Sequence, residues 1–158
     1  MPSLRLVFAT LCGAFLAGAV GARSAAAAPP GPYDPELART LGADEHGMRS
    51  YVLVILKTGP TPVPAGPERD AMFEGHFANI ARLVGAGKLA LAGPFADAGG
   101  WRGLFIFAVP DVEEAQRLVA TDPVIRSGEM VAEYHRYYGS AALMLVNDAH
   151  PRVAKHPL

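Results

Sequence analysis

Hydrophobic residues are distributed along the chain in two patterns, which together predict an order of strands and helices. Short apolar runs bounded by glycine or proline predict four strands. These runs occupy residues 50–59, 88–95, 102–109 and 129–139. Two further segments repeat their apolar residues at three- and four-residue spacing, and this predicts helices over residues 67–85 and 112–120.

The predicted helices carry boundary signals of their own. Pro67 suits the first position of the first helix, and the glycines of "GAGK" suit its end. Asp111 and Glu114 form a capping box ahead of the second helix. The resulting β-α-β-β-α-β order predicts an α+β, ferredoxin-like fold, in which two helices cover one face of an antiparallel sheet.

The two central strands show no alternation of apolar and polar residues. A sheet covered by helices on one side only should alternate, whereas "YVLVIL" (51–56) and "LFIFAV" (104–109) are apolar throughout. We therefore expect both faces of these strands to be buried. A second copy packing sheet against sheet would cover the free face, which predicts a homodimer, a dimeric α+β barrel. Each subunit would then hold a cavity for a small-molecule ligand between sheet, first helix and loops.

Composition divides the chain into four regions. Residues 1–27 combine an early arginine, an uncharged apolar run and a stretch of small residues, which is the layout of a cleaved signal peptide. The apolar run is short for a membrane span, so we expect an exported protein, periplasmic or secreted, without stable membrane insertion. Residues 28–49 predict a flexible N-terminal arm. The domain covers residues 50–139, and a tail follows over 140–158, in which "AALMLV" (141–146) would add an edge strand.

Composition also excludes several classes of function. The single cysteine, Cys12, lies within the predicted signal peptide, so the exported chain would have no disulfide, thiolate nucleophile or cysteine-bound metal. Removing residues 1–27 lowers the Lys and Arg count from 14 to 12 against 15 acidic residues, which gives no electrostatic basis for binding nucleic acid. The sequence also lacks a P-loop, a dinucleotide-binding glycine motif and an H-E-x-x-H motif. We therefore expect no cofactor and no metal.

One histidine, His76, interrupts the apolar stripe of the first predicted helix. Four apolar residues share its face at helical spacing: Met72, Phe73, Ile80 and Leu83. An imidazole titrates near neutral pH and can act as a general base at the wall of a pocket. Periodicity alone favours the alternative, a core histidine whose ring nitrogens have backbone partners. The neighbouring glycine at position 75 is costly in a helix and indicates a close approach of another segment.

Several segments, in their order and spacing, resemble the YCII-related (YciI-like) domain family. They are the helix that contains His76, then "LVGAGKLALAGPFAD" (83–97), "GLFIFAV" (103–109) and "VEEAQRLVATDPVIRSG" (112–128). The similarity covers about residues 49–139. It implies a dimeric α+β barrel with a histidine–aspartate pair in a pocket. It also implies elimination or dehalogenation chemistry on small ring compounds, as in a few members, within a superfamily that includes lactone isomerases and small monooxygenases.

The resemblance makes His76 the first candidate for catalysis. Asp122, which precedes Pro123, is the first candidate for a partner that orients the imidazole. The alternative is that its carboxylate only caps the "PVIR" turn. Asp97 is the second candidate partner, and its alternative is an ordinary turn aspartate.

Other residues are candidates for binding the substrate. Gly93 and Pro94 are expected to shape a strand end and to form the rim of the pocket. Arg126 and Arg102 would hold an anionic substrate, or would simply be solvated. His135, on the last predicted strand, is expected to be structural.

Three hypotheses for function follow from these residues. The first is a small exported enzyme that uses His76 as general acid/base, with Asp122 or Asp97 as its partner. It would isomerise, eliminate from or hydrolyse a small cyclic or carbonyl-bearing organic molecule. The second is a binding module of the same fold, and the third is a dimerisation domain with a vestigial pocket. A solvent-reachable cavity at His76, with a carboxylate within hydrogen-bond reach, would favour the enzyme.

Overall fold

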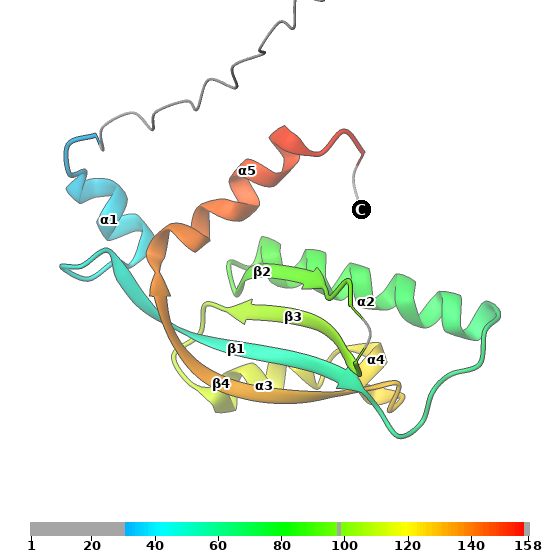
Figure 1. The fold of residues 1–158 in the computed structure, drawn as a ribbon. Helices are drawn as coiled ribbons and strands as arrows, with labels where there is room; N and C mark the ends of the chain where they lie inside the picture. The colour runs from blue at the N-terminus through cyan, green and yellow to red at the C-terminus, as the bar shows by residue number, and fades with distance from the viewer. Residues whose placement is uncertain (1–30, 98, 157–158) are drawn as a thin grey trace, which may run out of the picture. The chain divides into compact units, whose positions relative to one another are not determined.

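A four-stranded antiparallel sheet forms the centre of the protein (Figure 1). The computed structural model describes residues 31–97 and 99–156, so the predicted signal peptide lies outside the described residues. The strands lie in the order β2-β3-β1-β4. Their bounds are β1 (Met48–Thr58), β2 (Leu89–Pro94), β3 (Trp101–Phe107) and β4 (Met130–Ser140). The predicted α+β fold is confirmed, because this strand order is that of a ferredoxin-like sheet.

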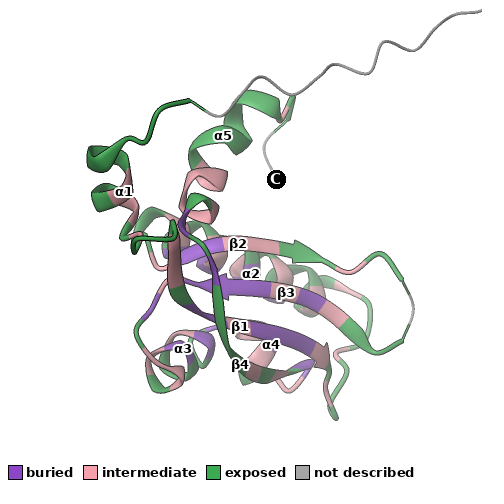
Figure 2. Cartoon of the chain, turned by 60° about the vertical axis from the view of Figure 1, so that its left-hand side comes forward, coloured by how far each residue is buried: buried purple, intermediate pink, exposed green. Residues whose placement is uncertain are grey.

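Three helices pack on one face of the sheet: α2 (Pro67–Gly85), α3 (Val112–Val119) and α4 (Pro123–Arg126). The main core lies between these helices and the sheet, where buried side chains of β1 and β3 meet those of the helices. Figure 2 shows the central strands as mostly buried. The N-cap half of the predicted capping box is confirmed, since a carboxylate oxygen of Asp111 accepts a hydrogen bond from the backbone N–H of Glu114 at 2.7 Å. The Glu114 carboxylate instead accepts a hydrogen bond from Nζ of Lys88 at 2.8 Å.

The second face of the sheet carries a smaller apolar cluster of Tyr51, Ala90 and Ile106. The apolar runs of β1 and β3 therefore do bury side chains on both faces. Part of the cover comes from the chain itself, because Leu143 and Met144 of the tail pack against this cluster. The second copy that would cover the rest of this face stays a prediction.

Residues before β1 contain a helix that the sequence does not predict. Within the expected N-terminal arm, α1 spans Pro35–Leu41. The side chain of Asp34 caps its first turn, and Gly42 ends it in a left-handed conformation. Seven residues are too few for a clear hydrophobic period, so the two caps are the signals that mark this helix.

The tail is helical, and the edge strand predicted at residues 141–146 is wrong. A 3₁₀ helix, η1 (Ala141–Leu145), and α5 (Val146–Val153) occupy the tail instead. Ala, Leu and Met favour helix over strand. The hydroxyl of Ser140 also accepts a hydrogen bond from the backbone N–H of Ala142 at 3.2 Å, which caps η1. Contacts with β2 place α5 near the edge of the sheet.

Candidate active site

His76 lies at the middle of α2, on the face that packs against the sheet. It is 7% exposed, and Met72, Asn79 and Leu83 are buried on the same helix. The ring of Phe105 on β3 stacks against the imidazole, with the ring centroids 6.1 Å apart. The spacing in the sequence thus places the imidazole between helix and sheet.

Asp122 contacts this imidazole from the turn that begins α4. Both of its carboxylate oxygens lie 2.9 Å from Nδ1 of His76, and the residue is fully buried. Oδ1 also accepts a hydrogen bond from the backbone N–H of Val124 at 3.1 Å, as an N-cap does. One carboxylate therefore caps the turn and also contacts the histidine, and the role of Asp122 as a partner in catalysis stays a prediction.

The pairing with Asp122 determines which imidazole nitrogen is available. A carboxylate only accepts hydrogen bonds, so Nδ1 of His76 carries the proton that it donates to Asp122. Nε2 is then the nitrogen with a free lone pair. His76 is one of the residues that line a cavity, and a molecule bound there that reaches Nε2 could give its proton to this nitrogen. This is the arrangement of a general base oriented by an aspartate.

Asn79 completes the buried polar cluster around Asp122. Its Nδ2 lies 3.3 Å from Oδ2 of Asp122. Its Oδ1 accepts hydrogen bonds from Nη2 of Arg82 at 2.7 Å and from the hydroxyl of Thr121 at 3.1 Å. The sequence-based candidates do not include Asn79, although a polar residue three positions after His76 lies on the same helix face. That spacing was the signal that could have identified it.

Gly75 accounts for the close approach of α4 to α2. A β-carbon at this position would lie 3.0 Å from Cγ of Pro123, which is closer than an ordinary carbon–carbon contact. The approach of another segment expected at this glycine is therefore confirmed. It brings the turn that carries Asp122 against the turn of α2 that carries His76.

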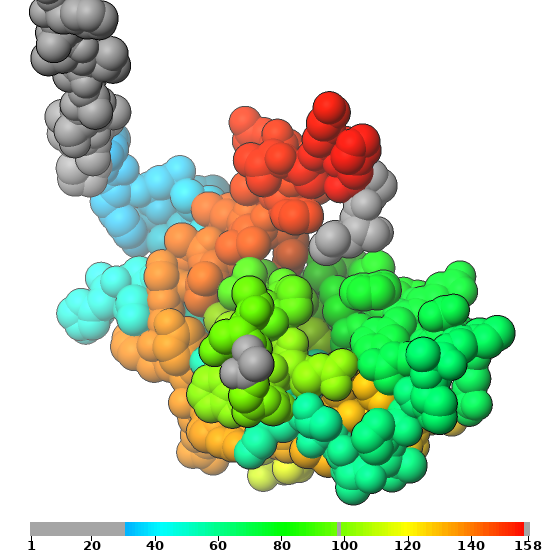
Figure 3. All heavy atoms as spheres, turned by 45° about the vertical axis from the view of Figure 1, so that its right-hand side comes forward, coloured from blue at the N-terminus to red at the C-terminus, as the bar shows by residue number. Residues whose placement is uncertain are grey.

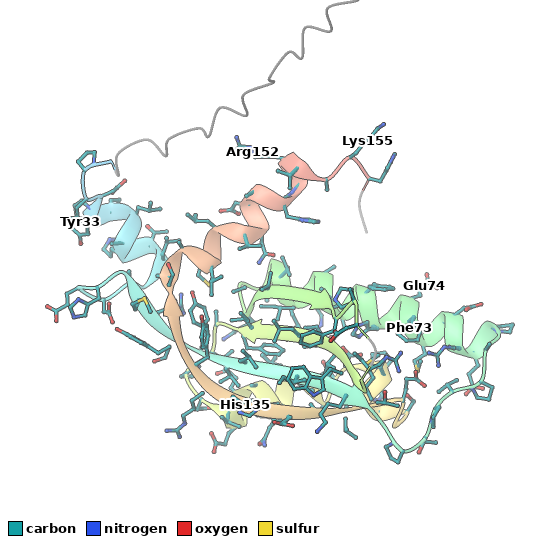
Figure 4. All side chains as sticks on the ribbon, viewed as in Figure 1. Tyr33, Phe73, Glu74, His135, Arg152 and Lys155 are labelled. Carbon is teal, nitrogen blue, oxygen red and sulfur yellow. The ribbon has the colours of Figure 1, made fainter. Side chains whose placement is uncertain are left out.

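The cavity beside His76 has a volume of about 850 Å³. Aromatic and aliphatic side chains form most of its wall, among them Phe73, Phe77, Ile80, Val84, Phe95 and Phe105. Neighbouring residues of α2 point in different directions, so only one side of the helix contributes to the wall. Figure 4 shows Phe73 directed toward the sheet, whereas the neighbouring Glu74 is exposed. A cavity of this size and polarity suits a small organic molecule.

The other sequence-predicted residues divide into those at the cavity and those away from it. Gly93 and Pro94 line the cavity, where the rim is predicted. Asp97 and Arg126 are exposed and are not among the lining residues. Asp97 lies in the loop that joins β2 to β3, beyond the paired part of these strands, and Asp122 is the carboxylate in contact with His76.

Helix α5 supplies a wall of the cavity that the sequence does not predict. The lining residues of this segment follow one helical face: Val146, Asn147, His150, Pro151 and Ala154. Nδ2 of Asn147 donates a hydrogen bond to the carbonyl oxygen of Leu89 on β2 at 2.8 Å, which ties the helix to the sheet edge. Figure 3 shows α5 on the side of the molecule where α2 and β2 lie. The tail is therefore part of the candidate site.

Arg102 brings a cation to the cavity through an irregularity in β3. Leu56 of β1 pairs with Gly103 and Lys57 pairs with Trp101, so Arg102 has no partner in the register. Along a regular strand, Arg102 and Gly103 would point to opposite faces. A β-bulge redirects the extra residue, and Arg102 here lines the same cavity as Gly103.

Glu129 is buried beside Arg102 and interacts with two guanidinium groups. Its Oε1 lies 2.8 Å from Nη2 of Arg69 and 3.4 Å from Nη1 of Arg102. Its Oε2 accepts a hydrogen bond from the backbone N–H of Val63 at 2.7 Å. The hydrogen bond from Arg69 is the main reason that the pKa of the Glu129 carboxyl lies below its ordinary value. One carboxylate thus faces two guanidiniums, and the group carries a net positive charge.

His135 forms a second histidine–carboxylate pair, but away from the cavity. Its Nε2 lies 2.8 Å from Oε1 of Glu133, and the His135 side chain is 48% exposed on β4. In the parts of the chain that the structure describes, no three His, Cys, Asp or Glu side chains are grouped to hold a metal ion. No helix in those parts is both long and apolar enough to cross a membrane.

Comparison with known proteins gives a match to one family and similarities of low sequence identity to solved structures. A solved structure similar to this chain is the 5-chloro-2-hydroxyhydroquinone dehydrochlorinase TftG from Burkholderia phenoliruptrix AC1100, in complex with 2,5-dihydroxybenzoquinone. It is 19% identical with a TM-score of 0.41, and the match covers 54% of this chain and 92% of that one. No curated protein matches the sequence. The family profile of the YCII-related domain matches residues 50–135, which confirms the resemblance seen in the sequence. Because this match covers more than half of the chain, the protein belongs to the YCII-related domain family.

Proposed function

We propose that the protein is an acid/base enzyme that acts on a small cyclic or carbonyl-bearing organic molecule. The observation that carries this proposal is the 2.9 Å contact between Nδ1 of His76 and Asp122 at the wall of an apolar cavity of about 850 Å³. An imidazole oriented by a buried carboxylate is a minimal acid/base dyad, which can take up and return a proton near neutral pH.

In the proposed reaction, Nε2 of His76 accepts a proton from a carbon next to a carbonyl group of the substrate. The electron pair of the C–H bond moves toward the carbonyl oxygen, and His76 becomes an imidazolium that Asp122 stabilises by its charge. Return of the proton to a different carbon completes an isomerisation. Departure of a leaving group with its electron pair completes an elimination. Proton abstraction from a water molecule would instead lead to hydrolysis of an ester or lactone.

The surroundings of the pair support this chemistry. Asp122 is fully buried and Phe105 stacks on the imidazole, and charges interact more strongly in such apolar surroundings than in water. The contact between Asn79 and Asp122 fixes the carboxylate, so the imidazole is oriented before a substrate binds. Aromatic side chains on the cavity wall suit a ring-shaped substrate.

The test is a screen of small lactones, phenols and halogenated ring compounds for turnover by the wild-type protein and by His76→Gln. We expect turnover of at least one class, and a loss of roughly 10²–10⁴-fold in His76→Gln, because the general base is absent. His135→Gln is the matched control, since His135 also contacts a carboxylate but lies outside the cavity lining. It should retain the wild-type rate. Equal turnover by wild type and His76→Gln would remove His76 from the mechanism.

A binding module for small ligands is the second candidate function. The observation that favours it is the composition of the wall, which is largely apolar and would hold a ligand without any reaction. Under this alternative, ring compounds bind to the wild type and to His76→Gln with similar affinity, and no compound of the screen is converted.

We further propose that the chain is exported and assembles as a homodimer. The support for export is the signal-peptide layout of residues 1–27, which would deliver a periplasmic or secreted product. N-terminal sequencing of the mature protein should begin at residue 28, and an uncleaved chain retained in the cytoplasm would contradict export. The support for the homodimer is the apolar surface on the face of the sheet opposite the helices, where Val131 is 42% exposed.

A further inference from the structure

The ionisable residues that line the cavity are all bases. They are His76 from α2, Arg102 from β3 and His150 from α5. Within the described residues, no aspartate or glutamate is part of the lining. An apolar cavity whose wall can carry charge of one sign only selects ligands of the opposite sign, so this cavity favours anions over cations.

Arg102 is the permanent charge among the three bases, because a guanidinium stays protonated in proteins. Its side chain is 31% exposed, and its side-chain hydrogen bond is to Glu129 at 3.4 Å, which is long for such a bond. Glu129 is held more closely by Arg69 at 2.8 Å and by the backbone N–H of Val63 at 2.7 Å. Most of the donor capacity of Arg102 is therefore left for a ligand.

The backbone of β3 is irregular at this residue. Arg102 is the extra residue of the bulge opposite Leu56 and Lys57. Without the bulge, the alternation of β3 would direct Arg102 to the sheet face opposite Phe105, which stacks on His76. The bulge thus places a cation and the imidazole on the wall of the same cavity.

We propose that the cavity binds ring compounds that carry an anionic oxygen group, a carboxylate or a phenolate, and that Arg102 binds this group. The guanidinium presents pairs of N–H donors in a planar fork that matches a carboxylate, and the apolar wall takes the ring. The inference names the substrate class for the proposed function, on which it rests for the reacting end at His76. Arg126, the other arginine considered from the sequence, is exposed on α4 and outside the cavity lining.

The test compares 2-naphthoate with its neutral isostere 2-naphthamide by isothermal titration calorimetry on the folded protein. At about pH 8 the carboxylate of naphthoate is ionised, and Arg102 is the permanent positive charge on the cavity wall. We expect the wild type to bind naphthoate at least roughly ten-fold more tightly than naphthamide. In Arg102→Met this preference should disappear while the affinity for naphthamide changes little. Arg102→Lys should retain part of the preference.

Arg126→Met is the matched control, because it removes the same charge outside the cavity and should keep the full preference. The naphthoate affinity of the wild type should also fall as NaCl is raised, while naphthamide affinity should not. This second measurement tests the proposal even if Arg102→Met does not fold. Equal affinity of the wild type for both probes, binding of neither probe, or an equal loss of both in folded Arg102→Met would overturn the proposal.

His76→Gln separates this inference from the proposed function. A naphthoate preference that persists in this variant, with no turnover of any compound by the wild type, would leave the binding inference standing and refute the enzyme. Turnover that depends on His76 but is confined to neutral compounds, with no naphthoate preference, would refute the inference and leave the enzyme standing.

Discussion

The carboxylate of Asp122 performs two tasks with one pair of oxygens. It caps α4 through the backbone N–H of Val124 and contacts Nδ1 of His76, and Asn79 holds its second oxygen. Because the residue is fully buried, each of these partners would lose a hydrogen bond if the side chain were removed. The two tasks can be separated by the choice of replacement.

Asp122→Asn should damage catalysis more than folding. Its amide oxygen can still cap Val124, but a neutral amide has no charge with which to stabilise an imidazolium. We expect kcat on a substrate found in the screen to fall roughly 10²–10⁴-fold. Asp122→Ala should in addition lose about 1 kcal/mol of stability with the cap. Kinetics and urea unfolding measure the two effects, and Asp97→Asn, in an exposed loop, should change neither. An unchanged kcat in Asp122→Asn would contradict the proposed pair.

The sequence predicts those site residues whose neighbours along the chain make them stand out. His76 interrupts an apolar stripe, and Asp122 stands before a proline, so both are visible in the sequence. Arg102 does not stand out in this way as a cavity residue, because a regular β3 would place it on the face opposite Phe105. Its position depends on a bulge against β1, and the register between two strands is a property of the folded pair.

At the scale of elements, the sequence predicts the bounds of a helix correctly where the residues at its two ends determine where it starts and stops. α2 begins at Pro67 and ends at Gly85, as predicted, because a proline suits the first turn and glycines end the helix. α5 is different. It has eight residues, a length that is marginal for an isolated helix in water. Its Pro151 has no N–H to bond the carbonyl of Asn147. Docking onto the domain therefore stabilises it, and docking leaves no periodic pattern in the sequence.

Asn147→Ala should loosen α5 without destabilising the domain. The substitution removes the 2.8 Å hydrogen bond to the carbonyl oxygen of Leu89, which contributes about 1 kcal/mol. Amide exchange in α5 should then become roughly five-fold faster, and exchange in α2 and β1 should not change. Asp148→Ala, at the neighbouring exposed position, is the control and should leave exchange in α5 as it is. The same slow exchange in both variants would show that Asn147 does not anchor the helix.

At the scale of the whole molecule, Glu129 joins distant parts of the chain. It accepts hydrogen bonds from Val63 in the loop before α2 and from Arg69 within α2, and it contacts Arg102 on β3. Its pKa is lowered chiefly by the Arg69 hydrogen bond. A carboxyl whose pKa is lower in the folded than in the unfolded chain stabilises the fold above the unfolded pKa. That stabilisation is lost as the pH falls through the folded pKa.

Glu129→Gln should therefore lower the free energy of unfolding at neutral pH. In this variant the free energy of unfolding should also fall less steeply as the pH is lowered below about 4.3, the ordinary pKa of glutamate. Urea unfolding at a series of pH values measures this profile. Glu133→Gln is the matched control. The pKa of Glu133 is also lowered, first by a hydrogen bond from Lys57, but its side chain is 46% exposed and solvent screens the interaction. Its profile should follow the wild type. A Glu129→Gln profile parallel to the wild type would refute this role.

The face of the sheet opposite the helices determines the proposed assembly. Val131 of β4 pairs with Lys57 of β1 and alternates with Ala132, which packs against the main core, so Val131 points away from that core. Further along β4, Tyr137 packs on Tyr51 with ring centroids 6.2 Å apart, yet it is 38% exposed. These apolar side chains share the face with Glu133 and His135 of β4. A second sheet that covers this face would pack on both kinds of side chain.

A charge on this face should prevent association if the homodimer forms there. We expect the mature protein to sediment as a dimer at micromolar concentration and Val131→Asp to sediment as a monomer, because the interface would remove a charged carboxylate from water. Val153→Asp introduces the same charge at a valine that is 81% exposed on α5, and it should remain a dimer. A monomeric wild type would contradict the assembly itself. A dimer that persists in Val131→Asp would place the interface on another surface. The C-terminal tail would then be the only segment that covers the second face of the apolar runs of β1 and β3.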